Sequence, residues 1–291
     1  MLTPGLRGHG RDRATPTTRS IVVDGRHLRV DITPGTAAPR SGLTVGQVPL
    51  LLINGIGASL ELLQPFVDAF PGTSDVIRFD PPGVGGSKAP ALPYRMGGLC
   101  RLIARMLSAL GHDRVDVLGI SWGGGVAQHF AAFQPGRCRR LVLVSTATGA
   151  LMVPARPAVL ARMVTPRRYL DPGYLVAVAP ALYGGSARLD PSRIGEFVHA
   201  ESRVGASKGY LYQLAAAAGW TSLPFLPLIR QPTLIMAGDD DPLIPLANAR
   251  LLNAVIARSR LHVYRGGHLA LVTEAAEHAP VVSRFLGEPD E

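Results

Sequence analysis

The chain has 291 residues, of which 47% are hydrophobic and 18% charged, and it carries a formal net charge of +9 at pH 7. This length suits one large α/β domain, or a core domain with an insertion, and the composition is that of a packed globular protein. The basic residues are scattered, without a stripe of interleaved aromatic residues. We therefore expect a solvated, arginine-rich surface and no nucleic-acid partner.

The sequence contains two cysteines, Cys100 and Cys138. Two cysteines cannot build a disulfide framework, and their spacing matches no metal site, so no metal is predicted. The N-terminal segment lacks the apolar stretch of a secretory signal, and no run of about 18 apolar residues predicts a membrane span. These features favour a cytoplasmic protein with reduced thiols.

The first half of the chain predicts a tail, a hairpin and then alternating strands and helices. Residues 1–18 are interpreted as a flexible basic tail. In the hairpin, apolar residues flank Asp24-Gly25, a dipeptide typical of a tight primed turn. The alternation that follows predicts a mostly parallel sheet with helices on both faces. The expected strands are residues 50–53, 76–79, 115–118 and 141–144, with helices near 60–70, near 96–110 and from about 122.

This alternation breaks between residues 147 and 225, where prolines recur and apolar residues have helical spacing. We interpret residues 147–225 as a helical cap inserted into a core made of residues 19–146 and 226–288. One helix of this cap is expected around residues 211–218. The alternation then resumes, with strands expected at 233–236 and 261–264 and helices near 247–256 and 273–286.

A candidate nucleophile is Ser121, within residues 119–123, which read G-I-S-W-G. This pattern is typical of a sharp strand-to-helix turn that exposes the serine hydroxyl. Ser207, within residues 205–209, matches the same G-x-S-x-G pattern. Only Ser121 follows a predicted strand and precedes a predicted helix, so we interpret Ser207 as a chance match.

A serine nucleophile needs a positioned base, and the sequence favours His268. His268 follows the last predicted strand, on a loop at the same sheet edge as Ser121. Seven other histidines lie in less suitable places, in the tail, in predicted strands or helices, or in the insertion. These are His9, His27, His112, His129, His199, His262 and His278.

The base needs a carboxylate, and three adjacent aspartates, 239–241, follow the predicted strand 233–236. Their charges repel, so they cannot all face one histidine. Asp240 and Asp241 both remain candidates from the residues alone. An aspartate here gives the chain order serine, aspartate, histidine, which is the order expected for the α/β-hydrolase fold.

Two backbone N–H groups are candidates for binding a developing oxyanion. One is that of Trp122, directly after the nucleophile, and the other is that of Ile56, in the glycine-containing loop 54–57. The loop 80–87 is also rich in glycine, but it lacks the patterns of nucleotide-binding loops. We expect it to be a structured loop near the site entrance.

With these features the chain resembles the intracellular poly(3-hydroxyalkanoate) depolymerases, which act on medium-chain-length polyester in storage granules. The resemblance runs from about Leu50 to Leu286 and includes segments of the predicted cap. It is carried by residues 54–57, 60–62, 79–80, 82–87, 121–124, 166–169, 183–185, 219–222 and 231–245.

The resemblance implies an α/β-hydrolase fold with a helical cap and a cofactor-free ester hydrolase. Its motif D-x-x-x-P falls on Asp241 and its G-H-L segment on His268, which implies a triad of Ser121, Asp241 and His268. It also implies a hydrophobic polyester or acyl ester substrate and association with the surface of storage granules.

Alternatives to this reading keep the fold but change the chemistry. A general carboxylesterase or lipase, a carbon–carbon bond hydrolase and a hydroxyacyl transferase could all use the same serine. A binding protein without catalytic activity is a further alternative, which the ordered set of serine, aspartate and histidine disfavours.

Overall fold

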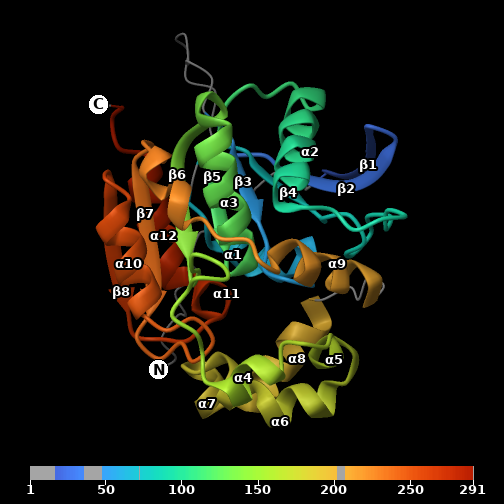
Figure 1. Cartoon of the computed structure of the whole chain (residues 1–291), viewed down its shortest axis with the longest axis vertical. Helices are drawn as coiled ribbons and strands as arrows, with labels where there is room; N and C mark the ends of the chain where they lie inside the picture. Colours follow the sequence, from blue (N-terminus) through green and yellow to red (C-terminus); the bar gives the residue numbers. More distant parts are fainter. Residues whose placement is uncertain (1–16, 36–47, 72, 202–206, 291) are drawn as a thin grey trace, which may run out of the picture.

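A single eight-stranded sheet organises the computed structural model, which describes residues 17–35, 48–71, 73–201 and 207–290 (Figure 1). The strand order is β1-β2-β4-β3-β5-β6-β7-β8. The β1–β2 and β2–β4 pairs are antiparallel, and the other neighbouring pairs are parallel. The strands are β1 (Thr17–Val23), β2 (Arg26–Thr33), β3 (Leu50–Ile53), β4 (Val76–Phe79), β5 (Val115–Ile120), β6 (Cys138–Val144), β7 (Thr233–Gly238) and β8 (Ser259–Tyr264).

The central strands are buried along almost their whole length because helices cover both faces of the sheet. In β3 all four residues are buried. Leu50 and Leu52 pack into one hydrophobic cluster, whereas Leu51 and Ile53 pack into the other, on the opposite face. The sheet therefore has a hydrophobic core on each side, as the sequence analysis predicted.

Two groups of helices provide these cores. One face is covered by η1 (Leu60–Leu63), α1 (Gln64–Ala69), α11 (Ala270–Thr273) and α12 (Ala275–Leu286). The other face is covered by α2 (Met96–Ala109), α3 (Trp122–Phe133) and α10 (Ala247–Val255), with η3 (Leu223–Leu228) beside them. The short η2 (Pro135–Arg137) joins α3 to β6. The helix expected near 60–70 is divided into η1 and α1, whereas the one expected near 273–286 is α12, which the short α11 precedes.

The predicted hairpin is confirmed as β1 and β2. Asp24 and Gly25 both have positive φ, 51° and 70°, which is the backbone conformation of a type I′ turn. The hairpin is longer than expected, because Thr17 and Thr18 pair with Ile32 and Asp31. The predicted flexible tail of residues 1–18 is therefore wrong at its last two residues, while residues 1–16 lie outside the described part of the chain.

Between β6 and η3 the described residues form the α-helices α4–α9, which we call the cap helices (Figure 1). The two ends of this segment meet in an antiparallel bridge between Gly149 and Thr221. That the segment acts as a mobile lid stays a prediction. The cap helices are α4 (Pro157–Ala161), α5 (Arg167–Leu170), α6 (Pro172–Tyr183), α7 (Ser186–Leu189), α8 (Pro191–Glu201) and α9 (Ser207–Ala217).

Candidate active site

Ser121 occupies a sharp turn between β5 and α3. Its φ of 55° and ψ of −121° are unusual for a residue with a side chain and point to local strain. The flanking glycines make the turn possible. A Cβ atom on Gly119 would lie 2.3 Å from the Gly123 carbonyl oxygen, and one on Gly123 would lie 2.1 Å from that of Ile53. Small residues are thus required where the serine is presented above the sheet.

His268 and Asp241 form a buried hydrogen-bonded pair. His268 Nδ1 lies 2.8 Å from Asp241 Oδ2, and since an ionised carboxylate only accepts, the imidazole nitrogen donates. The second carboxylate oxygen accepts hydrogen bonds from the backbone N–H groups of Leu243, at 2.9 Å, and Ile244, at 2.8 Å. Both oxygens of the Asp241 carboxylate therefore accept hydrogen bonds. The pair uses Nδ1 of the imidazole and does not involve Nε2.

The two preceding aspartates are held by other groups. Asp240 accepts hydrogen bonds from Arg188 Nε at 2.7 Å, from its Nη2 at 3.0 Å and from the Gly185 N–H at 2.8 Å. The bond from Arg188 holds the pKa of Asp240 below its usual value. Asp239 accepts a bond from the Gly266 N–H at 3.1 Å. The second candidate carboxylate of the sequence analysis thus binds a cap helix and not the histidine.

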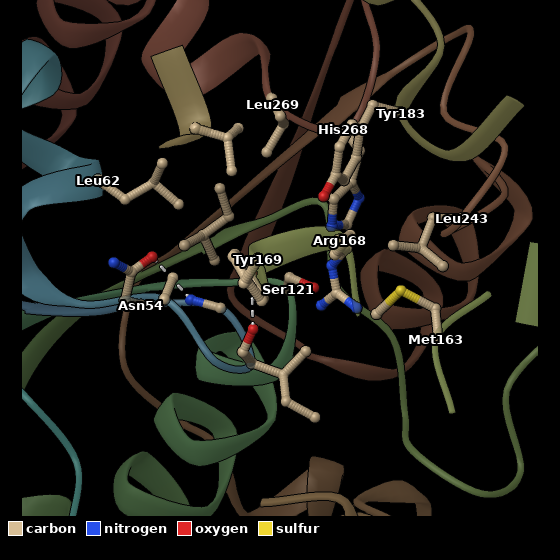
Figure 2. Close-up of a pocket in the computed structure, with 15 residues that line it drawn as sticks. Asn54, Leu62, Ser121, Met163, Arg168, Tyr169, Tyr183, Leu243, His268 and Leu269 are labelled. Atoms are coloured by element: carbon tan, nitrogen blue, oxygen red, sulfur yellow. Dashed lines mark hydrogen bonds between the residues drawn. The ribbon is translucent and has the colours of Figure 1, made fainter. Parts of the chain in front are cut away.

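Ser121 and His268 line one cavity beneath the cap helices (Figure 2). Their side chains come from the ends of β5 and β8, which the sheet brings to the same edge. The structure records no hydrogen bond between these two described side chains, so that contact stays a prediction. What the fold does bring together is the serine, the histidine and, through the histidine, Asp241.

The loop 54–57 lies beside Ser121 and is held by two cap residues. Gly57 N–H donates to Gln213 Oε1 at 2.6 Å, and Tyr169 Oη donates to the Ile56 carbonyl oxygen at 2.8 Å. Among the described residues, no acceptor is recorded for the backbone N–H of Ile56 or of Trp122. Two N–H groups predicted to bind an oxyanion are therefore free to do so.

Sequence reasoning missed the residues by which the cap contacts this site. Gln213 and Tyr169 hold the oxyanion loop, as described above. Tyr183 accepts a hydrogen bond from the His268 N–H at 2.7 Å through its carbonyl oxygen. Its ring also stacks on the imidazole, with centroids 6.3 Å apart and planes 12° from parallel. The available signal for Gln213 was a polar residue in an apolar helical segment, but no pattern indicated its partner.

The other described histidines do not line this cavity. His129, in α3, packs against the rings of Phe133 and Phe225, and His278, in α12, packs against Tyr264. Burial lowers the pKa of both imidazoles. His9 lies outside the described residues, and the side chain of His199 is not described. His27, His112 and His262 lie in β2, after α2 and in β8.

The loop 80–87 is built around a buried carboxylate. Asp80 accepts hydrogen bonds from the backbone N–H groups of Leu60, at 2.7 Å, and Gly86, at 2.8 Å. Burial raises the pKa of Asp80. In the same loop, Gly83 packs so closely on Gly209 of α9 that a Cβ on Gly83 would lie 2.8 Å from the Gly209 Cα. The loop is structured and contacts the cap.

Neither a metal cluster nor a spanning helix is found in the described ranges. No group of three or more His, Cys, Asp or Glu residues there could hold a metal ion. No helix in those ranges is both long and apolar enough to cross a bilayer. Cys100 and Cys138 are buried free thiols.

Comparison with known proteins places this chain in a family. A model of the alpha/beta hydrolase fold matches residues 48–275, so the chain belongs to that fold family. A "Poly(3-hydroxyalkanoate) depolymerase" from Ectopseudomonas oleovorans is 48% identical over 269 residues, which cover 92% of each chain. The chain is thus a member of the poly(3-hydroxyalkanoate) depolymerase family and an ester hydrolase.

More distant relatives share the fold. A "2-hydroxymuconate semialdehyde hydrolase" from Pseudomonas sp. (strain CF600) is 29% identical over 267 residues, covering 83% of this chain and 88% of the relative. The solved structure of the enol-lactonase from Burkholderia xenovorans LB400 superposes with a TM-score of 0.76 at 25% identity. It covers 93% of this chain and all of that one. The fold thus serves several kinds of hydrolase.

Proposed function

We propose that this chain hydrolyses medium-chain poly(3-hydroxyalkanoate), or its oligomers, to (R)-3-hydroxy fatty acids, with Ser121 as nucleophile. The observation that carries the proposal is the His268–Asp241 hydrogen bond of 2.8 Å, made at the rim of the cavity that Ser121 also lines. The likeness to the depolymerase from Ectopseudomonas oleovorans supports the choice of substrate.

In the acylation step, His268 Nε2 takes the proton of the Ser121 hydroxyl as the oxygen attacks the ester carbonyl. Asp241 holds the imidazole with Nδ1 protonated and stabilises the imidazolium that forms. The N–H groups of Ile56 and Trp122 bind the oxyanion of the tetrahedral intermediate. The bond between the acyl carbon and the alcohol oxygen then breaks, and His268 gives its proton to the leaving alcohol.

Deacylation repeats these steps with water. His268 removes a proton from a water molecule, whose oxygen attacks the acyl-enzyme carbonyl. The Ser121 oxygen leaves with the proton returned by His268, and the hydroxy acid is released. The residues of this chain supply every proton transfer, and the mechanism requires no cofactor.

The lining of the cavity suits alkyl chains, because aliphatic side chains predominate on it. Its free volume is about 30 Å³, which is room for about two water molecules and far less than an acyl chain needs. Substrate entry therefore requires the cap helices to move away from the core. The aliphatic lining residues are Ile56, Ala58, Leu62, Ile120, Val198, Leu243 and Leu269.

The surface of the cap supports a location on storage granules in the cytoplasm. The cap exposes apolar side chains, with Leu189 88% exposed, Val164 63% and Leu170 52%. Such side chains would gain hydrophobic free energy at a polyester surface. In a sedimentation assay with polyester granules, we expect the protein to pellet with them. A variant with Leu189, Val164 and Leu170 replaced by serine should stay in the supernatant while still hydrolysing soluble esters.

The substrate class is tested by parallel assays. We expect release of 3-hydroxy acids from a medium-chain polyester suspension and hydrolysis of 4-nitrophenyl octanoate. Hydrolysis of the small ester without any attack on the polyester or its oligomers would favour a general carboxylesterase or lipase. Cleavage of a vinylogous diketone at a higher kcat/KM than any ester would favour a carbon–carbon bond hydrolase.

A hydroxyacyl transferase is separated from a hydrolase by product analysis. With coenzyme A present, the proposal expects free hydroxy acid and no thioester, because water attacks the acyl-enzyme. A dominant thioester product would contradict it. Binding of polyester without any hydrolysis or acyl transfer would contradict every hypothesis in which the protein is an enzyme.

A further inference from the structure

Arg168 is a buried arginine that faces the catalytic cavity. It lies in α5 with only 2% of its surface exposed and lines the same cavity as Ser121 and His268. Figure 2 shows its guanidinium among the side chains that project towards the cavity. A guanidinium is charged at every accessible pH, so this cavity holds a permanent positive charge close to the nucleophile.

The partners of Arg168 are all uncharged. Nη1 donates a hydrogen bond to Tyr210 Oη at 2.8 Å, and the guanidinium stacks on the rings of Tyr169 and Tyr210, 4.5 and 5.2 Å from their centroids. Tyr183 is a further neighbour. Nε is buried and has no hydrogen-bond partner in the described structure. Cation–π contacts stabilise the charge, but they do not neutralise it.

Other buried arginines in the described ranges have acidic partners. Arg78, also 2% exposed, forms an ion pair with Asp31 at 2.6 Å, and Arg140 forms one with Asp290 at 3.1 Å. No ion pair with Asp or Glu is recorded for Arg168 among the described residues. A buried charge without a counter-ion is costly, and such a charge at the wall of a binding cavity is satisfied when a ligand brings the opposite charge.

We propose that Arg168 binds the free carboxylate of a hydroxyacyl chain end and so selects esters that carry one. The proposal rests on the proposed ester hydrolysis and specifies its substrate. In a 3-hydroxy acid the carboxylate is close along the chain to the ester oxygen, so once the cap helices have moved, one residue can place its carboxylate at Arg168 and its ester at Ser121. A guanidinium can donate two parallel hydrogen bonds to a carboxylate, and the unpaired Nε is available for one of them.

The reaction itself stays a hydrolysis. The bond between the acyl carbon and the oxygen of the terminal 3-hydroxy acid breaks, and His268 protonates that oxygen. Water supplies the hydroxyl group of the second product, a shortened chain with its own new carboxylate. That carboxylate can then occupy the Arg168 site, so short oligomers would be degraded one unit at a time from this end.

The test compares two substrates that differ only in charge, the linear dimer of 3-hydroxyoctanoate as free acid and as methyl ester. We expect the wild-type kcat/KM to be at least about 30-fold higher for the acid, given the cost of leaving a buried charge unpaired. Arg168→Met should remove this preference, so that kcat/KM for the acid falls to the value that the same variant shows for the methyl ester.

The neighbouring Arg167→Met is the matched control, since Arg167 has a 61% exposed side chain and pairs with Asp171 on the surface. It should keep the preference for the acid. Arg168→Lys keeps the charge but loses the paired donors, and it should retain part of the preference. It also serves as the test variant if Arg168→Met does not fold.

Three results would overturn the role of Arg168. These are equal wild-type kcat/KM for acid and methyl ester, a preserved preference in Arg168→Met, or an equal loss on both substrates, which would indicate a purely structural arginine. Absence of wild-type hydrolysis on every ester would instead contradict the proposed function. The two failures are therefore distinguishable.

Discussion

The sheet core and the cap helices hold their functional residues in different ways. In the core, Ser121 and His268 follow strands whose backbone ladder and aliphatic side chains set their positions, as with the fully buried β3. The cap instead reaches the site through individual hydrogen bonds, such as those that the Gly57 N–H donates to the Gln213 side chain and the His268 N–H donates to the Tyr183 carbonyl oxygen. The core thus fixes the chemistry, while the cap shapes the cavity around it.

The two regions also differ in what they expose. The aliphatic residues of β3 are at most 1% exposed, whereas Leu189 in the cap is 88% exposed. The cap also has buried residues, such as Leu175 and Leu182, but several of its outer apolar side chains are open to solvent. Under the proposed function, the core would keep the catalytic arrangement while the cap helices move to admit an acyl chain.

The largest effect is expected at the nucleophile of the core. Ser121→Ala should lower kcat on the order of a million-fold, because no other hydroxyl can take its place. Steady-state assays with 4-nitrophenyl octanoate measure this. Ser207→Ala, in the second G-x-S-x-G sequence, is the control and should keep full activity. Substantial turnover by folded Ser121→Ala protein would refute the assignment.

Replacing each of the two adjacent aspartates should lower kcat by very different factors. Asp241→Asn should lower kcat about ten-thousand-fold, because the amide cannot hold His268 in the required tautomer. Asp240→Asn removes the negative charge that pairs with Arg188, in an exposed ion pair between cap and core, and should change kcat less than about tenfold. Equal losses in both variants would mean that the two carboxylates share the role.

A residue larger than glycine beside Ser121 should destabilise the turn. Gly123→Ala places a methyl group against the Ile53 carbonyl oxygen and should destabilise the fold by about 3 kcal/mol or more. Gly98→Ala, in α2, meets no atom within 4 Å and should stabilise the protein by up to about 1 kcal/mol. Urea unfolding of both variants measures the free energies. A stable Gly123→Ala protein would contradict the close packing of the turn.

A smaller effect is expected where the cap holds the oxyanion loop. Gln213→Ala leaves the Gly57 N–H without its acceptor and should lower kcat about tenfold, with KM nearly unchanged. Leu211→Ala, on an exposed position of the same helix, is the control and should retain its kcat. A rise in KM alone would indicate that Gln213 contributes to substrate binding and not to loop position.

The smallest expected effect is the dependence of folding stability on pH. Burial lowers the folded-state pKa of His278 and His129 below the ordinary value of 6.5. Below about pH 6.5 the unfolded chain binds protons at these histidines more readily than the folded chain does. The contribution of the two histidines to the free energy of unfolding is therefore fully present above about pH 6.5 and is lost as the pH falls towards the folded pKa. The Tm should decrease over this window, and less so in His278→Gln. An identical pH profile in the variant would exclude His278 as a contributor.

The sequence predicted the core more completely than the cap. Aliphatic runs such as residues 50–53 indicate buried strands without further information, and the G-I-S-W-G turn needs its glycines for local steric reasons. The choice between Asp240 and Asp241 required the family pattern, because composition alone does not place two adjacent carboxylates. The structure brings Asp241 against His268 and Asp240 against Arg188.

The cap contacts were beyond prediction from the sequence for a physical reason. Gln213 and Gly57 are separated by 156 residues, and no periodicity encodes a single side-chain contact over that separation. Arg168 looks in sequence like one more surface arginine beside Arg167, yet the fold buries one and exposes the other. Such differences depend on how helices pack, which sequence patterns specify weakly.

The central claim, that Ser121 is the nucleophile activated by His268, is tested most directly by covalent labelling. A fluorophosphonate probe followed by peptide mass spectrometry should give one adduct per chain, on the peptide that contains Ser121. Labelling should be lost in Ser121→Ala and strongly slowed in His268→Gln. An adduct on another residue, with hydrolysis abolished in step with it, would contradict the account.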